Sequence, residues 1–252
     1  MSQANFAGQV ALIIGASRNM GRAFAEALAA DGAAVAIHYH SAGSRASAEE
    51  AAAAINAAGG QAFAVQADVT KVAEVRRLFD AVEDRFGHLD ILINTAGMMV
   101  KKAVTEISEE EFDAIFALNT KAAFFALQEA GRRIRDNGRI VSVGTSLLAA
   151  TTSHYGAYAG SKAPLEDFTR ALAKEIGHRG VTVNVVAPGP MDTEFFYAVE
   201  TPETVAYLKR ASINGELGQV ADLVPLVKHL VSPENRWTTA QTLFINGGFV
   251  SR

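Results

Sequence analysis

Two side chains that could transfer a proton stand four residues apart, Tyr158 and Lys162, at the end of the segment SHYGAYAGSK. On a helix, positions i and i+4 share a face, so the phenol and the ammonium would project together. A fixed ammonium within a few Å favours the phenolate, which predicts a pKa for Tyr158 below its ordinary value of about 10. The same spacing also occurs on solvated helices without any chemical role, so the interpretation depends on the elements around it.

Those elements are apolar runs of strand length that alternate with helix-like segments. Strands are expected at residues 10–14, 33–39, 62–66, 89–93, 139–143, 181–186 and 243–245, and helices at 21–31, 46–58 and 112–130. Continuous apolar strands separated by helices predict a parallel sheet that is covered on both faces. The expected fold class is α/β, a doubly wound Rossmann-type sheet of about seven strands, with ligands at the carboxyl ends of the strands.

Composition narrows the class of protein. The 252 residues are 49% hydrophobic and 20% charged, with a net charge of -4 and no cysteine. We expect a single domain over 1–252. Scattered basic residues argue against a nucleic-acid partner, and the lack of an apolar run of about 18 residues argues against a membrane span. With no disulfide possible and no leader-like start, the expected location is cytoplasmic.

A glycine pattern follows the first expected strand and precedes a helix. Its sequence, GASRNMG, runs from Gly15 to Gly21. Glycines there allow a tight turn and a close backbone approach to a pyrophosphate, whose charge the helix N-terminus would meet. The candidate cofactor-binding residues of this turn are Gly15, Ser17, Arg18, Asn19, Met20 and Gly21.

The end of the second strand carries no acidic residue. A carboxylate there would accept from a ribose 2′-hydroxyl, whereas this chain has His40 and Ser41 and no acid before Glu49. Arg18, Ser41 and Arg45 could contact a 2′-phosphate, so NADP(H) is preferred over NAD(H). A metal site on the histidines at 38 and 40 is not expected, because no third ligand stands nearby.

Small and polar residues follow the later strands. Asp68 could accept from an adenine amine, although Asp and Asn also cap helices at such turns. Asn119 lies in an apolar helical stretch, where its amide must find partners. The candidate cofactor-binding residues at these strand ends are Asp68, Val69, Asn94, Ala96, Gly97, Pro188, Gly189 and Thr193.

The order and spacing of these motifs resemble the short-chain dehydrogenase/reductase family over essentially the whole chain. The resemblance rests on the glycine turn, Asn94-Thr95-Ala96-Gly97, Asn119, the YxxxK pair, Pro188-Gly189 and Asn246-Gly247-Gly248. The strand end HYH resembles the pteridine reductases, and the segment 109–125 resembles the NADPH-dependent naphthol and ketone reductases.

The resemblance implies reduction of a small-molecule carbonyl compound with NADPH. Tyr158 would donate the proton, Lys162 would lower the pKa of Tyr158 and hold the nicotinamide ribose, and Asn119 would hold a relay water. Thr193 would anchor the nicotinamide carboxamide. The apolar faces over 112–135 and 158–177 exceed what one face of a sheet can cover, so we expect the subunits to pair through these helices. The resemblance further implies a homotetramer.

Three features depart from the family pattern or complicate it. Asn19 stands where glycine is usual, and Asn tolerates positive φ better than most other residues. Thr145 stands at the position of the catalytic serine, with Ser146 as the alternative. Tyr155 precedes Lys162 by seven residues, the spacing of enoyl reductases, and would imply reduction of a C=C bond if it were the donor.

The expected substrate pocket uses the loops at 98–100, 147–154 and 191–217, the last of them as a lid. Its Met, Phe and Tyr residues suggest an apolar substrate, or else a packed lid or subunit contact. The competing interpretation of the whole chain is an NADPH-binding regulatory protein with little or no turnover, because fold alone does not establish catalysis.

Overall fold

Seven parallel strands form one sheet in the order β3-β2-β1-β4-β5-β6-β7. The structure is a computed structural model that describes residues 6–150 and 152–251. Each strand begins and ends within two residues of its predicted bounds. The strands are β1 (Val10–Ile14), β2 (Ala34–Tyr39), β3 (Gln61–Gln66), β4 (Ile91–Asn94), β5 (Arg139–Val143), β6 (Thr182–Pro188) and β7 (Thr242–Ile245).

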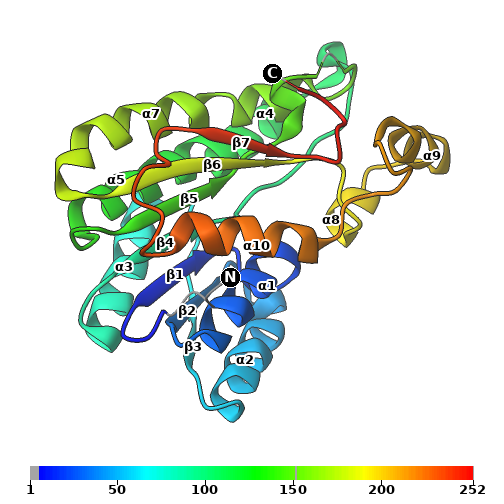
Figure 1. The fold of residues 1–252 in the computed structure, drawn as a ribbon. Coiled ribbons are helices and arrows are strands. Elements are labelled where there is room, and N and C mark those ends of the chain that lie inside the picture. Colours follow the sequence, from blue (N-terminus) through cyan, green and yellow to red (C-terminus); the bar gives the residue numbers. More distant parts are fainter. Residues whose placement is uncertain (1–5, 151, 252) are drawn as a thin grey trace.

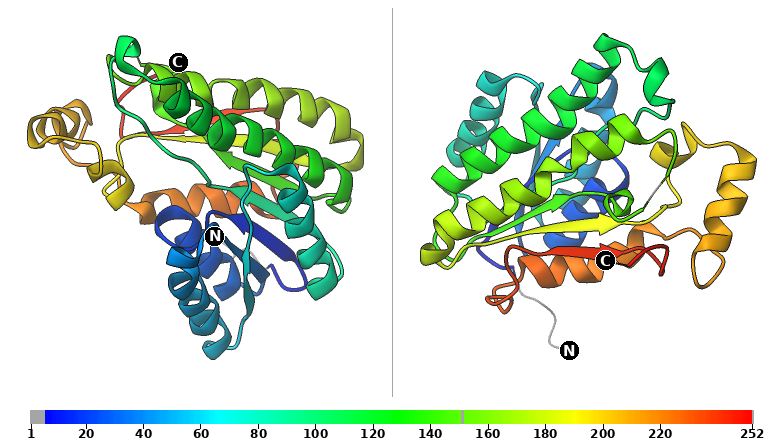
Figure 2. Two further views of the ribbon diagram at one scale, coloured as in Figure 1. Left: turned by 180° about the vertical axis from the view of Figure 1, so that it is seen from behind. Right: turned by 90° about the horizontal axis from the view of Figure 1, so that it is seen from above.

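Helices cover both faces of this sheet, as Figures 1 and 2 show. They are α1 (Asn19–Ala30), α2 (Ala42–Ala57), α3 (Val72–Phe86), α4 (Glu109–Phe116), α5 (Ala123–Arg133), α6 (Gly156–Lys162), α7 (Pro164–Ile176), α8 (Glu194–Tyr197), α9 (Pro202–Ala211) and α10 (Val220–Val231). None of the helices in the described part of the chain is long and apolar enough to cross a membrane.

The alternation of side chains along β1 explains the two layers. Ala11 and Ile13 pack with α1, α2 and α10, whereas Leu12 and Ile14 pack with α3, α5 and α7. All four side chains are buried, and full burial of one such aliphatic side chain stabilises the fold by about 1.5–3 kcal/mol. A strand that is buried on both faces is apolar at most of its positions, which is why the near-continuous apolar runs predicted the strands.

The predicted continuous helix over 112–130 is wrong in detail. A π-helical turn, Ala117–Ala122, separates α4 from α5 and carries Asn119. Such wider turns inside helices are often found at functional sites. The apolar pattern runs through the turn unchanged, so no local signal predicts the wider turn.

Two short helices lie outside the layers. In Figure 1, α8 and α9 extend from the end of β6 beyond the carboxyl edge of the sheet. Their small apolar cluster contains Phe196, Leu208 and Leu217. These elements form the predicted lid region at 191–217.

Candidate functional site

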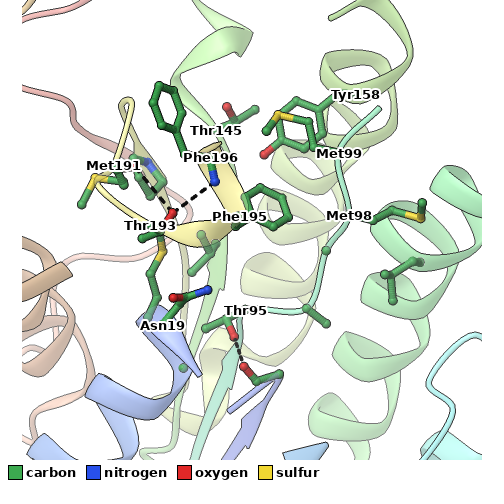
Figure 3. Close-up of a pocket in the computed structure, with 18 of the residues that line it drawn as sticks. Asn19, Thr95, Met98, Met99, Thr145, Tyr158, Met191, Thr193, Phe195 and Phe196 are labelled. Carbon is green, nitrogen blue, oxygen red and sulfur yellow. Dashed lines mark hydrogen bonds between the residues drawn. The ribbon is translucent and has the colours of Figure 1, made fainter. Parts of the chain in front are cut away.

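A cavity of about 940 Å³ opens at the carboxyl ends of the strands, between the sheet edge and α8 and α9. Figure 3 shows part of its lining. The structure brings the predicted site residues together here, with the exceptions of Asp68, Asn94 and Asn119. The predicted residues that line the cavity are Gly15, Ser17, Arg18, Asn19, Met20, Gly21, His40, Ser41, Val69, Ala96, Gly97, Thr145, Ser146, Tyr158, Lys162, Pro188, Gly189 and Thr193.

The glycine turn leads from β1 into α1 through two residues with positive φ, Gly15 at 84° and Asn19 at 49°. Asn19 is therefore the non-glycine residue that accepts the left-handed conformation in this turn. A methyl group on Gly21 would lie 2.8 Å from Ala16 Cα and 2.8 Å from Thr95 Oγ1. Only glycine fits there, and the turn keeps the N-terminus of α1 open towards the cavity.

His38 holds this turn from beneath, a role that sequence reasoning missed. Its Nδ1 accepts from the Gly15 amide at 3.0 Å, and its Nε2 lies 2.9 Å from the Ala67 carbonyl oxygen. An amide can only donate and a carbonyl can only accept, so the ring must be neutral with its proton on Nε2. Burial lowers the pKa of His38 to about 4. The histidine thus joins the ends of β1, β2 and β3.

The end of β2 lies beside the cavity as predicted. Of the two arginines predicted to contact a 2′-phosphate there, only Arg18 lines the cavity. Arg18 lines the cavity with a 72% exposed side chain that lies 3.8 Å from the Glu194 carboxylate. His40 and Ser41 also line it. Arg45, by contrast, is exposed and lies outside the lining.

Asp68 and Asn94 shape the loops rather than the cavity wall. Asp68 Oδ1 accepts from the Thr70 amide and hydroxyl, and hydrogen bonding to Thr70 lowers the pKa of Asp68. Asn94 Oδ1 accepts from the Ala96 amide at 3.2 Å. Both side chains serve the turn chemistry that the sequence had left open as an alternative. Val69 and Ala96 occupy the wall beside them.

Tyr158 and Lys162 both belong to α6 and are buried in the cavity wall. The expected lowering of the Tyr158 pKa is wrong for the chain without a cofactor: burial raises it to about 12, opposed by a hydrogen bond with Thr145. Lys162 directs its ammonium to the carbonyl oxygens of Val143 at 3.1 Å and Ala96 at 3.5 Å. Burial lowers the pKa of Lys162 to about 8. Desolvation therefore outweighs the attraction within the pair.

The hydroxyl beside Tyr158 comes from Thr145, which Figure 3 shows next to the phenol. Ser146 instead donates its hydroxyl proton to the Ala187 carbonyl oxygen at 3.0 Å and is 1% exposed. The hydroxyl proton of Ser146 is thus used in a hydrogen bond to β6. Of the two candidates for the serine role, Thr145 is the one whose hydroxyl lies close enough to Tyr158 to oppose the rise of its pKa.

Asn119 makes three hydrogen bonds although it does not line the cavity. Its Oδ1 accepts from the Met98 amide, and its Nδ2 donates to the Met98 carbonyl and to Ser161 Oγ, each at 2.9 Å. A methyl group on Gly97 would lie 3.0 Å from Lys162 Nζ and 3.2 Å from Asn119 Oδ1. Gly97 therefore leaves the space between these two polar groups free.

Tyr155 is tied to a residue of the lid region. Its hydroxyl donates to the carboxylate of Glu200, and Lys101 Nζ lies 2.5 Å from that carboxylate. Burial and the neighbouring carboxylate raise the pKa of Tyr155. No local pattern in the sequence could reveal this cluster, because 99 residues separate Lys101 from Glu200.

Apolar side chains surround the hydroxyl of Tyr158 on the open side. Met98, Met99, Phe195 and Phe196 project into this part of the cavity (Figure 3). Thr193 Oγ1 accepts from the Phe196 amide at 3.3 Å and so caps α8. Residue 151, within the predicted pocket loop 147–154, lies outside the described residues.

No group of three His, Cys, Asp or Glu side chains within 6–150 and 152–251 is placed to hold a metal ion. The contacts of His38 account for both of its ring nitrogens. The arrangement offers hydroxyl, ammonium and amide groups beside an apolar space, which suits proton transfer to a polar atom of a bound molecule.

Comparison with known proteins decides the family. Residues 15–250 match the family model described as Enoyl-(Acyl carrier protein) reductase. A short-chain type dehydrogenase/reductase from Picea abies is 41% identical over 96% of this chain and 93% of its own length. The chain belongs to the short-chain dehydrogenase/reductase family. It is therefore an oxidoreductase of a family that uses nicotinamide cofactors.

Two further members of this family are similar over nearly the whole chain. An NADPH-dependent aldehyde reductase-like protein, chloroplastic, from Arabidopsis thaliana is 39% identical over 97% of this chain and 95% of its own length. A dehydrogenase from Burkholderia cenocepacia, crystallised with bound NADP, is 50% identical with a TM-score of 0.96, covering 100% of this chain and 97% of its own.

Proposed function

We propose that the protein reduces the carbonyl group of a small apolar molecule with NADPH. The observation that carries this proposal is the buried hydroxyl of Tyr158, which lies beside Thr145 (Figure 3) in the wall of a cavity lined by apolar side chains. With a pKa of about 12 the phenol carries its proton at neutral pH, whereas general acid catalysis is most efficient at a pKa near the working pH.

The cavity fits a dinucleotide. The pyrophosphate would lie at the N-terminus of α1, over the backbone that Gly15 and Gly21 keep free of side chains. Val69 and Ala96 would flank the adenosine, and Lys162 would hold the nicotinamide ribose. Pro188, Gly189 and Thr193 would contact the carboxamide. The nicotinamide, when bound, supplies the hydride.

The preference for NADP(H) rests on the end of β2. His40 and Ser41 line the cavity there without an acidic neighbour on the strand, so nothing on β2 repels a 2′-phosphate. Arg18 stands across the same opening with an exposed guanidinium. The NADP bound by the Burkholderia cenocepacia relative agrees with this assignment.

In the proposed reaction, Tyr158 donates its proton to the carbonyl oxygen of the substrate. Thr145 orients that oxygen and the phenol through its own hydroxyl. The Lys162 ammonium and Asn119 Oδ1 both border the space that Gly97 leaves free, and Oδ1 keeps a second lone pair after it accepts from the Met98 amide. A water held at that space would reprotonate Tyr158 by way of Lys162.

Substitution of the two tyrosines tests the donor. We expect Tyr158→Phe to lower kcat about 100-fold or more, since general acid catalysis contributes on the order of 10² to 10⁴. Tyr155→Phe should lower it much less, because the Tyr155 hydroxyl is bonded to Glu200. NADPH oxidation is followed with a panel of diketones, quinones, cyclic ketones and pterins.

The same panel separates the competing functions. NADPH binding without turnover of any member would favour a binding protein. Loss of activity in Tyr155→Phe and not in Tyr158→Phe would move the enzyme to C=C reduction, the reaction class named by the matching family model.

The cofactor assignment has its own test. Arg18→Ala should weaken NADPH binding about tenfold, the loss expected from one charge-assisted phosphate contact, and leave NADH binding unchanged. Fluorescence titration of both cofactors measures this. Equal affinities for NADH and NADPH in the unsubstituted protein would contradict the assignment.

A further inference from the structure

The lid region is joined to the opposite wall of the cavity by a buried ionic cluster. Lys101 lies in the loop after β4, Tyr155 begins α6 as its N-cap residue, and Glu200 lies between α8 and α9. Lys101 Nζ is 2.5 Å from Glu200 Oε2, and the Tyr155 hydroxyl donates to Glu200 Oε1. Each carboxylate oxygen thus has one partner from the far side of the cavity.

This cluster is more buried than the ion pair beside it in the chain. The Glu200 side chain is 1% exposed and that of Lys101 is 16% exposed, whereas the neighbouring pair of Lys102 and Glu111 is 45% and 31% exposed. Lys101 Nζ also lies 5.3 Å from the centre of the Tyr155 ring. A buried charge that loses its partner is strongly destabilising, so the cluster holds as a unit or opens as a unit.

The cluster belongs to the substrate side of the cavity. Glu200 and Tyr155 both line it, and Tyr155 packs in one apolar cluster with Tyr158, the proposed proton donor. Met98, Met99 and Leu147 complete that cluster. A carboxylate in such a wall would repel an anionic substrate, and an unpaired ammonium would attract one.

We propose that Lys101, Glu200 and Tyr155 form a latch that fixes the lid over the substrate and makes the pocket selective for uncharged carbonyl compounds. Glu200 is a positioning residue: it draws α8 and α9 towards Tyr155 and neutralises Lys101. The selectivity rests on the proposed carbonyl reduction, whereas the latch itself does not.

Hydrogen exchange tests the latch without turnover. In the NADPH-loaded protein, Glu200→Gln and Lys101→Met should each increase amide exchange over residues 194–211 at least tenfold. Lys102→Met removes a lysine of the same loop and serves as the matched control, with no change expected over 194–211. Unchanged exchange in both latch variants would overturn the proposal.

The charge rule is tested with a matched pair of probes, ethyl phenylglyoxylate and the phenylglyoxylate anion. In Glu200→Gln, the freed Lys101 ammonium should tighten binding of the anion to NADPH-loaded protein at least tenfold by calorimetry, and the ratio of kcat/KM for ester over anion should fall at least tenfold. Lys101→Met should show no increase in affinity for the anion.

A Glu200→Gln protein that binds both probes as the unsubstituted protein does would contradict the rule. Where Glu200→Gln fails to fold, Lys101→Arg and Lys101→Met give the same comparison, with Arg expected to keep lid protection and Met to lose it. If no probe is reduced but exchange and calorimetry follow the expectation, the latch stands and the carbonyl reduction fails.

Discussion

At the scale of single residues, the spacing of Tyr158 and Lys162 is readable from sequence, but their electrostatics are not. Both lie in α6 as predicted, yet burial moves their pKa values in the direction that favours the neutral forms. Depth of burial depends on the elements packed around α6, which no local pattern specifies. The choice of Thr145 over Ser146 likewise depends on tertiary structure, because the Ser146 hydroxyl donates to the Ala187 carbonyl oxygen of the neighbouring strand β6.

Lys162→Met should raise the free energy of unfolding of the cofactor-free protein at pH 7. The pKa of Lys162 falls from 10.5 to about 8 on folding, so below pH 8 the folded state carries the full cost of the buried charge, about 3 kcal/mol. The substitution also removes the hydrogen bonds of Lys162 to two carbonyl oxygens, which offsets part of this cost. The expected net increase in the free energy of unfolding is about 1–2 kcal/mol.

Urea denaturation measures this gain, with the exposed Lys174→Met on α7 as a control that should change little. As pH rises from 8 towards 10.5 the difference between Lys162→Met and the unsubstituted protein should shrink, because the lysine then sheds its proton in the folded state first. A variant less stable than the unsubstituted protein at pH 7 would show that the ammonium stabilises the fold.

At the scale of elements, strands were predictable and their junctions less so. The bounds of β1 and β5 match the predicted runs. All five residues of β1 are apolar, whereas β5 also buries Arg139 and Ser142. The π-helical turn at 117–122 leaves the pattern unbroken, so only the fold shows where Asn119 meets Met98. His38 was interpreted only as a poor metal ligand, although it supports the glycine turn.

The neutral His38 makes the glycine turn sensitive to acid. Its folded pKa of about 4 lies below the ordinary 6.5, so between these values the unfolded chain binds a proton that the folded chain does not. Stability is therefore fully present above pH 6.5 and falls by up to about 3 kcal/mol as pH drops towards 4. A charged ring would also carry a proton on Nδ1, which could then no longer accept the hydrogen bond from the Gly15 amide.

His38→Gln should remove this part of the pH dependence and weaken NADPH binding at pH 7, because the Gly15 turn loses its aligned acceptor. Thermal unfolding between pH 4.5 and 7 gives the slope. His178→Gln, at an exposed site after α7, is the matched control and should keep the slope of the unsubstituted protein. An identical slope in His38→Gln would mean that other groups cause the acid sensitivity.

At the scale of the whole molecule, the sheet order brings the loops after the strands to one edge, so residues far apart in sequence form one site. This convergence was predictable because it follows from a parallel, doubly wound sheet. The latch of Lys101, Glu200 and Tyr155 was not, since two of its members lie in loops whose course the strands do not determine.

The outer surface of α4 and α5 carries two of the large apolar side chains that are exposed. Phe112 and Phe124 are 47% and 40% exposed, and the ring of Phe124 packs edge-on against Phe168 with centroids 5.0 Å apart. Exposed aromatic residues on adjacent helices are typical of surfaces that pair with another subunit. We propose that two copies of this chain meet through these helices.

Phe124→Asp should lower the molecular mass in solution to that of a smaller assembly, because a carboxylate on a buried, symmetric interface faces its own copy across the two-fold axis. Size-exclusion chromatography with light scattering measures the mass, and circular dichroism checks that the helices persist. Val104→Asp, 75% exposed outside these helices, is the control and should leave the mass unchanged. Equal masses for Phe124→Asp and the unsubstituted protein would place any subunit contact elsewhere.

A parallel loss of activity in Phe124→Asp would further indicate that pairing supports α6, whose Tyr158 and Lys162 lie just before α7.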